Sequence, residues 1–338
     1  MKIRRFIAVF LSALILCGVL TVPAAALEDP AIRAKAALLV EAETGTILYD
    51  KNIHDELSIA STTKIMSALL VFEAIDRGEL RLDQQVTATA TALRGLPEDG
   101  STADIVEGET LTVEQLLYCM LVISANETCN ILGEAVAGSV DAFVEQMNAR
   151  AASLGMEQTS FRNACGLDTE GHLSTARDVA IMSRTILTTC PEVLHYTGIW
   201  TDTLRGGQTQ LVNTNKLLRR YSGITGLKTG TTSGAGVCIS ASATRDGLNL
   251  IAVVLGALSS KERFEAATTL LDYGFANYAA APLPTLPERP LALAVKGSTE
   301  DSVPLDYAAL PETILIEKGT TSAPVSYTHL TLPTIRLV

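Results

Sequence analysis

Spacings typical of metal sites or disulfide frameworks are missing from this 338-residue chain. Of its six cysteines, Cys17 lies in an N-terminal apolar run, and the other five are widely spaced without a Cys-x-x-Cys pair. The four histidines show no ligand spacing either. The sequence therefore predicts no metal, no cofactor and no disulfide framework, and it favours small buried apolar roles for most of the remaining cysteines.

Positive charge is scarce. The chain has 26 Lys and Arg against 37 Asp and Glu, a formal net charge of −11. An acidic chain is a poor binder of nucleic acid, so we exclude that class of partner. Charged residues make up only 19% and hydrophobic residues 47%, which is enough apolar material for a sizeable core. The length fits one large domain, or one with a small companion.

The N-terminus has the composition of a secretion signal. Lys2, Arg4 and Arg5 precede an apolar run from Phe6 to Val22, and Pro23-Ala24-Ala25-Ala26 offers small residues for cleavage. We expect residues 1–26 to be removed and the protein to be exported, which would bring the net charge to −14 because this segment has three basic and no acidic residues. The alternative is a retained membrane anchor, since the run is near the lower length limit for a spanning helix.

The central stretch of the chain is Ile59 to Met66, which places Ser61 three residues before Lys64 at the start of an apolar, helix-like segment. On a helix this spacing puts both side chains on one face, about 5–6 Å apart at their Cβ atoms. A desolvated lysine can take the proton of a serine hydroxyl and so make it a nucleophile. Alone the pattern is weak, because a serine at a helix start is commonly a cap.

The order of the predicted elements indicates an α+β fold. A hairpin is expected where residues 36–42 and 46–49 flank Gly45, and another where 237–243 and 248–255 flank Arg245-Asp246-Gly247. Between the hairpins, helical patterns cover 65–76, 112–123, 127–136, 140–154 and 175–189, and a closing helix covers 261–278. We therefore expect an antiparallel sheet formed by the two ends of the chain, flanked by helices, with a helical lobe inserted between them.

The C-terminal part is expected to be separate from a catalytic domain over residues 27–280. A Pro-rich linker covers 281–290. Residues 291–338 indicate a partial β-rich domain. Its last stretch, from Val325, has a pattern unlike the rest of the chain, which we interpret as a truncated or foreign end.

Three short motifs follow one another in the chain. Ser61-Thr62-Thr63-Lys64 comes first, Ser124-Ala125-Asn126 follows at a break between helices, and Lys228-Thr229-Gly230-Thr231 leads toward the second hairpin. Together they resemble the signature Ser-x-x-Lys, Ser-x-Asn and Lys-Thr-Gly of the penicillin-recognising serine hydrolases. The resemblance covers about residues 30–280 and implies a β-lactamase/DD-peptidase-like fold.

Other segments separate the members of that superfamily. The Glu-x-x-Leu-Asn motif of class A β-lactamases does not occur after Ser124-Ala125-Asn126, where the chain reads Glu157 to Asn163. Ser160-Phe161-Arg162-Asn163 with Gly166-Leu167 instead resembles the low-molecular-weight penicillin-binding proteins, which are serine-type D-alanyl-D-alanine carboxypeptidases. That family often adds a C-terminal β-rich domain and an amphipathic membrane anchor. No such helix is seen in this sequence, so membrane contact stays possible but unsupported.

The resemblance implies a catalytic role for four side chains. Ser61 would be the nucleophile on the penultimate D-alanine of a peptidoglycan stem peptide, and β-lactams would be its covalent inhibitors. Lys64 would be the general base, which must be neutral part of the time. Ser124 would relay a proton to the leaving amine, and Asn126 would hold Lys64 and a substrate amide in line.

Substrate binding would fall to the third motif. Lys228 and Thr229 would bind the terminal carboxylate, an anion suited to a cation and a hydroxyl donor. Gly230, lacking a side chain, would let the substrate backbone lie along the strand edge. The backbone N–H groups of Ser61 and Thr231 would form the oxyanion hole, although many relatives have a histidine at the position of Thr231.

Two further residues, Arg263 and His172, have sequence contexts related to these motifs. Arg263 resembles a family arginine near the carboxylate site, but an ordinary solvated arginine on the closing helix fits equally well. His172 lies in a loop that the family shares, near a helix start, and we interpret it as structural.

Other functions of the same fold remain open at this point. They are a β-lactamase, a DD-endopeptidase and a β-lactam sensor or wall-binding module that is acylated without turnover. The presence of all five residues Ser61, Lys64, Ser124, Asn126 and Lys228 disfavours a dead enzyme, because each has a distinct chemical task.

Overall fold

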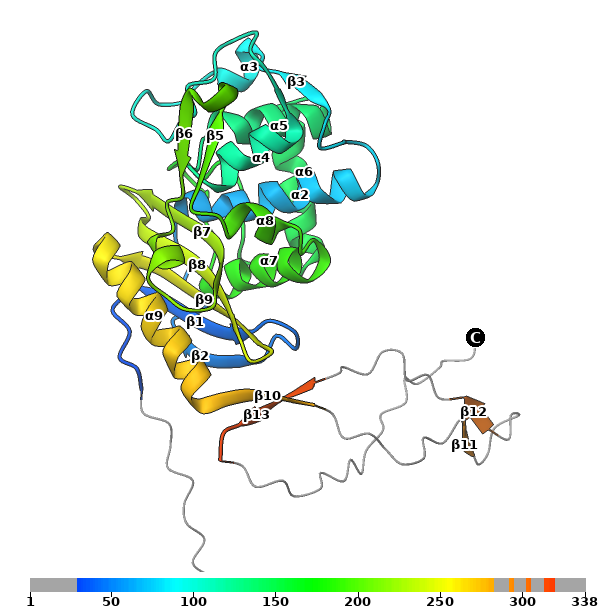
Figure 1. The fold of residues 1–338 in the computed structure, drawn as a ribbon, viewed down its shortest axis with the longest axis vertical. Coiled ribbons are helices and arrows are strands. Elements are labelled where there is room, and N and C mark those ends of the chain that lie inside the picture. The colour runs from blue at the N-terminus through cyan, green and yellow to red at the C-terminus, as the bar shows by residue number, and fades with distance from the viewer. Residues whose placement is uncertain (1–28, 283–291, 295–301, 305–312, 320–338) are drawn as a thin grey trace, which may run out of the picture. The chain divides into compact units, whose positions relative to one another are not determined.

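The computed structural model of the protein describes residues 29–282, 292–294, 302–304 and 313–319. Figure 1 shows these residues as a ribbon. The expected signal peptide, most of the expected linker and the C-terminal stretch from Val325 lie outside the described residues.

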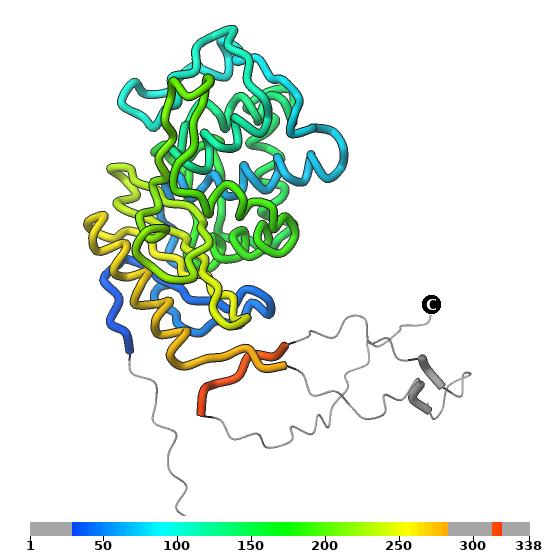
Figure 2. Tube along the Cα trace, viewed as in Figure 1, coloured from blue at the N-terminus to red at the C-terminus, as the bar shows by residue number. Residues whose placement is uncertain are grey.

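A five-stranded antiparallel sheet organises the fold, with the strand order β2-β1-β9-β8-β7. Its strands are β1 (Ala36–Glu41), β2 (Ile47–Lys51), β7 (Ile224–Thr232), β8 (Gly236–Arg245) and β9 (Leu248–Ala257). Figure 2 shows the early hairpin in blue beside the late strands, and β1 pairs directly with β9. The prediction of an antiparallel sheet made by the two ends of the chain is therefore confirmed, including both hairpins.

The sheet separates two apolar cores, because alternate side chains of a strand point to opposite faces. Leu38 and Val253 belong to the core that also contains helix α2 (Lys64–Asp76). Leu39 and Val254, their direct neighbours in the chain, belong to the core under helix α9 (Ser260–Asn277). In Figure 1, α9 covers one face of the sheet and the helical lobe the other.

The helical lobe lies between β2 and β7 in the chain. Its α-helices are α2, α3 (Ala90–Leu93), α4 (Val113–Leu121), α5 (Glu127–Ala137), α6 (Val140–Ser153), α7 (Ala176–Thr189) and α8 (Val193–Thr197). A capping box begins α4 at Thr112, since its hydroxyl accepts from the N–H of Gln115 while the Gln115 side chain accepts from the N–H of Thr112. The inserted helical lobe is thus confirmed.

Short elements differ from the expectation. Ser61 lies in a 3₁₀ turn, η1 (Ala60–Thr63), rather than in an α-helical turn, whereas α2 begins at Lys64, close to the expected start. The helix α3 was not expected, nor were the small strand pairs β3 (Gln85–Thr87) with β4 (Thr110–Thr112) and β5 (Thr201–Leu204) with β6 (Thr209–Val212). Two further 3₁₀ turns are η2 (Arg205–Gly207) and η3 (Lys216–Arg219).

Beyond α9 the chain forms short strand pairs. Strand β10 (Tyr278–Pro282) pairs with β13 (Thr313–Glu317), and β11 (Ala292–Ala294) pairs with β12 (Ser302–Pro304). Strand β10 includes the first two residues of the expected linker. No helix within the described ranges has the length and apolar character needed to cross a membrane.

Candidate active site

Lys64 is the centre of the candidate site. Its side chain is fully buried at the start of α2, and its Nζ contacts three acceptors: Ser61 Oγ at 2.9 Å, Asn126 Oδ1 at 2.8 Å and the Cys165 carbonyl oxygen at 2.9 Å. An ammonium group can donate to all three. A neutral amine can donate to Asn126 and Cys165 and accept from the Ser61 hydroxyl. The same geometry therefore accommodates both protonation states, as proton transfer between Ser61 and Lys64 requires.

The Cys165 carbonyl is aimed at Lys64 by a loop built around Asn163. The Asn163 Oδ1 accepts from the backbone N–H groups of Cys165, Gly166 and Leu167, at 3.2, 2.7 and 3.1 Å. Gly166 has a φ of +87°, in the left-handed region, and a Cβ there would lie 1.9 Å from the Ala60 carbonyl oxygen. The loop thus packs directly against η1, the turn that bears Ser61.

Strand β7 forms the other wall of the site and carries the Lys-Thr-Gly motif. The motif precedes the first strand of the second hairpin, as expected, and it lies itself inside the edge strand of the sheet, a strand that the sequence did not predict. A Cβ on Gly230 would lie 2.7 Å from the backbone N of Ser61. Only glycine allows η1 and β7 to approach this closely, so the Ser61 N–H and β7 are brought together as an oxyanion hole would need.

Lys228 and Thr229 are both buried on β7. Burial, the nearby Lys64 and then Arg263 hold the pKa of Lys228 well below its usual value. The Thr229 hydroxyl is 2.6 Å from that of Thr214, which the sequence analysis did not single out. An anion bound beside Lys228 would raise its pKa again and could also accept from the Thr229 hydroxyl, so the pair is suited to a carboxylate.

Arg263 is only 6% exposed, so the interpretation as an ordinary solvated arginine is wrong. Its Nη1 donates to the Gly230 carbonyl at 3.1 Å, and to Thr231 Oγ1 and the Cys238 carbonyl at 3.3 Å. Burial lowers its pKa to about 10. Its Nε is buried without a hydrogen-bond partner among the described residues. The guanidinium therefore braces β7 behind the Lys-Thr-Gly motif, and its role toward a substrate stays a prediction.

Ser124 has a strained backbone and an unsatisfied hydroxyl. Its φ is +68°, which is rare for a residue with a side chain. Its Oγ is buried and has no hydrogen-bond partner within the described part of the chain. Buried hydroxyls normally form a hydrogen bond. The unpaired hydroxyl of Ser124, two residues before Asn126, is therefore available to a partner from outside the protein.

The model of the D-alanyl-D-alanine carboxypeptidase family matches residues 23–259. The chain belongs to this family. It is 38% identical over 296 residues to the D-alanyl-D-alanine carboxypeptidase DacF of Bacillus subtilis, covering 86% of this chain and 75% of DacF. The family assignment makes this protein a serine-type peptidase.

Solved structures of family members agree with the fold. Penicillin binding protein 5 from Haemophilus influenzae gives a TM-score of 0.79 at 31% identity, covering 86% of this chain and 85% of that one. Penicillin-Binding Protein D2 from Listeria monocytogenes, solved in an ampicillin-bound form, gives 0.66 at 35% identity, covering 73% of this chain and all of that one. The fold class predicted from sequence is confirmed.

His172 lies outside the cluster around Lys64. It is buried, its Nδ1 accepts from the Arg162 N–H at 3.1 Å, and its Nε2 is 2.9 Å from Thr63 Oγ1. Because Nδ1 accepts, Nε2 carries the proton and donates to Thr63. These contacts tie the loop before α7 to η1 and agree with the structural role expected from sequence.

The environment of His172 predicts a loss of stability in acid. Burial, followed by the charge of Arg162, lowers its pKa from 6.5 to about 4. The unfolded chain takes up this proton more readily, so the stabilisation is complete above pH 6.5 and is lost as the pH falls toward 4, by roughly 3 kcal/mol in all. Urea unfolding between pH 7 and 4 should show this loss. His172→Gln should flatten it, whereas His54→Gln, at an exposed site, should not; equal curves for all three proteins would contradict the assignment.

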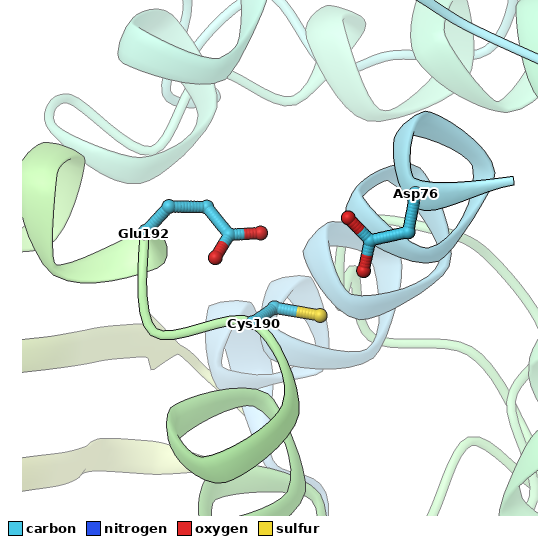
Figure 3. Close-up of side chains that lie close together, drawn as sticks. All are labelled: Asp76, Cys190 and Glu192. Carbon is cyan, nitrogen blue, oxygen red and sulfur yellow. The ribbon is translucent and has the colours of Figure 1, made fainter. Parts of the chain in front are cut away.

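A group of potential metal ligands lies away from the candidate site. Figure 3 shows the side chains of Asp76, Cys190 and Glu192 converging from the end of α2 and the segment between α7 and α8, with ligand atoms within 4.8 Å of one another. Both carboxylates are exposed, and burial raises the pKa of the Cys190 thiol. A metal prefers the thiolate, so we assign no metal to this cluster.

All five cysteines of the described residues are free and buried, in agreement with the expectation of small apolar roles.

Asp168, missed in the sequence analysis, accepts from Thr232 Oγ1 at 2.6 Å and from the Gly234 N–H at 2.8 Å. It thereby connects the Asn163 loop to the turn after β7. The sequence offered only its place two residues after Gly166 as a signal.

Proposed function

We propose that this protein removes the terminal D-alanine from peptidoglycan stem peptides through an acyl-enzyme on Ser61. The observation that carries the proposal is the position of Lys64 Nζ, within hydrogen-bond distance of both Ser61 Oγ and Asn126 Oδ1. A buried amine in this position is a base for the hydroxyl and is itself oriented by the amide.

The reaction would proceed in two halves. Lys64 accepts the proton of the Ser61 hydroxyl, and Oγ bonds to the carbonyl carbon of the penultimate D-alanine. The carbon–nitrogen bond then breaks as the unpaired hydroxyl of Ser124 gives its proton to the leaving amine and takes up the proton that Lys64 had accepted, so that D-alanine departs and both side chains return to their starting states. In the second half a water molecule bonds to the ester carbonyl carbon, the bond from that carbon to Ser61 Oγ breaks, and the proton of the water returns to Oγ, which releases the shortened peptide and restores the Ser61 hydroxyl.

Two groups of contacts would position the substrate. The N–H groups of Ser61 and Thr231 would stabilise the negative charge that develops on the carbonyl oxygen. Lys228 and Thr229 would bind the terminal carboxylate, which in turn favours the protonated form of Lys228. The substrate backbone would lie along β7, where Gly230 leaves room beside η1.

We further propose that β-lactams acylate the same serine. The proposal is supported by the likeness to Listeria Penicillin-Binding Protein D2, whose structures are described as ampicillin-bound and cefotaxime-bound forms. The basic and apolar N-terminus with its small-residue cleavage site supports export, so the enzyme would act outside the cytoplasm.

The test is release of D-alanine by the mature protein from a stem pentapeptide ending in D-Ala-D-Ala, with a matched peptide ending in D-Ala-L-Ala as the control. We expect release from the first peptide only, and inhibition after treatment with penicillin. Rapid hydrolysis of penicillin would indicate a β-lactamase instead. Cleavage of cross-linked peptide dimers without release from the pentapeptide would indicate an endopeptidase, and labelling by penicillin without any turnover would indicate a sensor.

A further inference from the structure

The residue after Asn126 is a buried carboxylate. Glu127 is 4% exposed and is the first residue of α5. Its Oε1 accepts from Thr102 Oγ1 at 2.8 Å and from the Ala103 N–H at 2.6 Å. No lysine, arginine or histidine forms an ion pair with it in the described structure. Burying a carboxylate without a cation is costly unless hydrogen bonds and a helix N-terminus stabilise it. The Glu127 side chain is therefore expected to keep its contacts with Thr102 and Ala103.

The segment that Glu127 holds also touches Asn126. The Asn126 N–H donates to the Ser101 carbonyl at 2.8 Å. Gly100 lies against the Asn126 amide so closely that a Cβ there would be 2.8 Å from Nδ2. The amide of Asn126 is therefore confined between the 100–103 segment on one side and Lys64 Nζ, at 2.8 Å from Oδ1, on the other.

We propose that Glu127 is a positioning residue for the reaction, acting through the 100–103 segment on Asn126 and hence on Lys64. Its carboxylate fixes Thr102 and Ala103, and the fixed segment keeps the Asn126 amide against Lys64. Glu127 touches neither Ser61 nor Lys64 through any hydrogen bond, so its effect is on geometry. The inference rests on the proposed function, because it assigns a role in aligning the general base.

A second contact holds the far end of the same segment. Arg205, in η2 between β5 and β6, donates to the Ala103 carbonyl at 3.0 Å and to the Asp104 carbonyl at 3.2 Å. It also pairs with Glu109, whose pKa is lowered by that bond. Loss of Glu127 would therefore free Thr102, the neighbour of Ser101, while Ala103 and Asp104 stay attached to Arg205, which favours a local change beside Asn126 over unfolding of the lobe.

The helix α5 offers a matched control. Glu134 lies two turns further along and accepts from two threonine hydroxyls, Thr89 at 2.5 Å and Thr91 at 2.6 Å. Glu134 thus joins α5 to residues 89–91, which precede the 100–103 segment in the chain and lie away from Asn126. Each carboxylate accepts two hydrogen bonds, the buried Glu127 from a hydroxyl and a backbone N–H and the half-buried Glu134 from two hydroxyls, and only the Glu127 contacts are with the segment beside Asn126.

The experiment measures the second-order rate of acylation by a fluorescent penicillin and the thermal midpoint of the full mature chain. Glu127→Ala should lower the acylation rate about 10²-fold, since misplacing a reacting group by about 1 Å costs that much, and should alter its pH profile because the environment of Lys64 changes. Glu127→Gln keeps an acceptor oxygen and should restore most of the rate. Glu134→Ala should keep the wild-type rate whatever its thermal midpoint.

Gly100→Ala tests the same idea without removing a buried charge. Its added methyl group displaces the Asn126 amide, so the acylation rate should again fall, even if Glu127→Ala does not fold. A folded Glu127→Ala or Gly100→Ala variant that reacts within twofold of wild type would overturn the inference. A wild-type protein that neither takes the label nor releases D-alanine would instead overturn the proposed function.

Discussion

A Ser61→Ala variant is expected to form no covalent adduct with a fluorescent penicillin and to release no D-alanine. The reason is that the acyl group has no other hydroxyl at the position facing Lys64 Nζ, 2.9 Å from Ser61 Oγ. Lys64 keeps its two other acceptors, Asn126 Oδ1 and the Cys165 carbonyl, so the variant should fold. The measurement is labelling in a denaturing gel alongside D-alanine release, with the thermal midpoint as a check of folding.

Lys64→Met separates the base from the nucleophile in the same assay. Methionine fills the buried space but cannot accept the Ser61 proton, so labelling should still occur at Ser61 but about 10²–10⁴-fold more slowly. The Asn126 and Cys165 oxygens would be left unpaired, which costs about 1–3 kcal/mol each, so the comparison must use folded protein. Wild-type labelling of Lys64→Met would show that another group is the base, and labelling of Ser61→Ala would show that another group is the nucleophile.

Local patterns in the sequence predicted much of this fold. The hairpin around Gly45 could be predicted because two apolar runs flank a residue that favours a turn, and α4 could be predicted from its capping box at Thr112. Strand β7 could not, because Lys228 and Thr229 are polar yet buried, so its hydropathy pattern gives no strand signal. The strand exists because it pairs with β8 over its whole length, which is a tertiary cause.

The site could be predicted only as far as it consists of side chains in short motifs. Ser61, Lys64 and Asn126 come together as the first two motifs implied. The third acceptor of Lys64 is the backbone carbonyl of Cys165. Every residue has a backbone carbonyl, so the sequence cannot indicate which of them contacts Lys64. Burial of Arg263 was equally invisible, since the closing helix contains both exposed and buried charged positions.

Contacts between segments distant in the chain explain the remaining differences. The Asp168 carboxylate bonds to Thr232 and Gly234, more than sixty residues later, and a single aspartate in a loop carries no signal for such a partner. The contacts of Glu127 could not be predicted either, because an acidic residue in the first turn of a helix is common and indicates no particular partner. In the structure Asp168 joins the Asn163 loop to Thr232 and to the turn after β7, and Glu127 binds Thr102 and Ala103.

Gly166→Ala is expected to be among the most damaging single-methyl additions near the site. The new Cβ would lie 1.9 Å from the Ala60 carbonyl oxygen and 2.9 Å from Thr63 Oγ1, both in η1. The φ of +87° adds about 1–2 kcal/mol of strain for a residue with a Cβ. Relief of the clash requires movement of the turn that bears Ser61 or of the loop that presents the Cys165 carbonyl to Lys64.

We therefore expect Gly166→Ala to lower the thermal midpoint strongly and, in whatever protein still folds, to reduce acylation by at least about 10²-fold. Gly171→Ala is the matched control. Gly171 has a similar φ of +76°, but its added Cβ would meet only the flexible guanidinium of Arg162, at 3.2 Å. Both variants carry the backbone strain, and only Gly166→Ala carries the clash with η1. If the two variants had the same thermal midpoint and the same acylation rate, the close packing of the loop on η1 would have no part in holding Ser61 and Lys64 together.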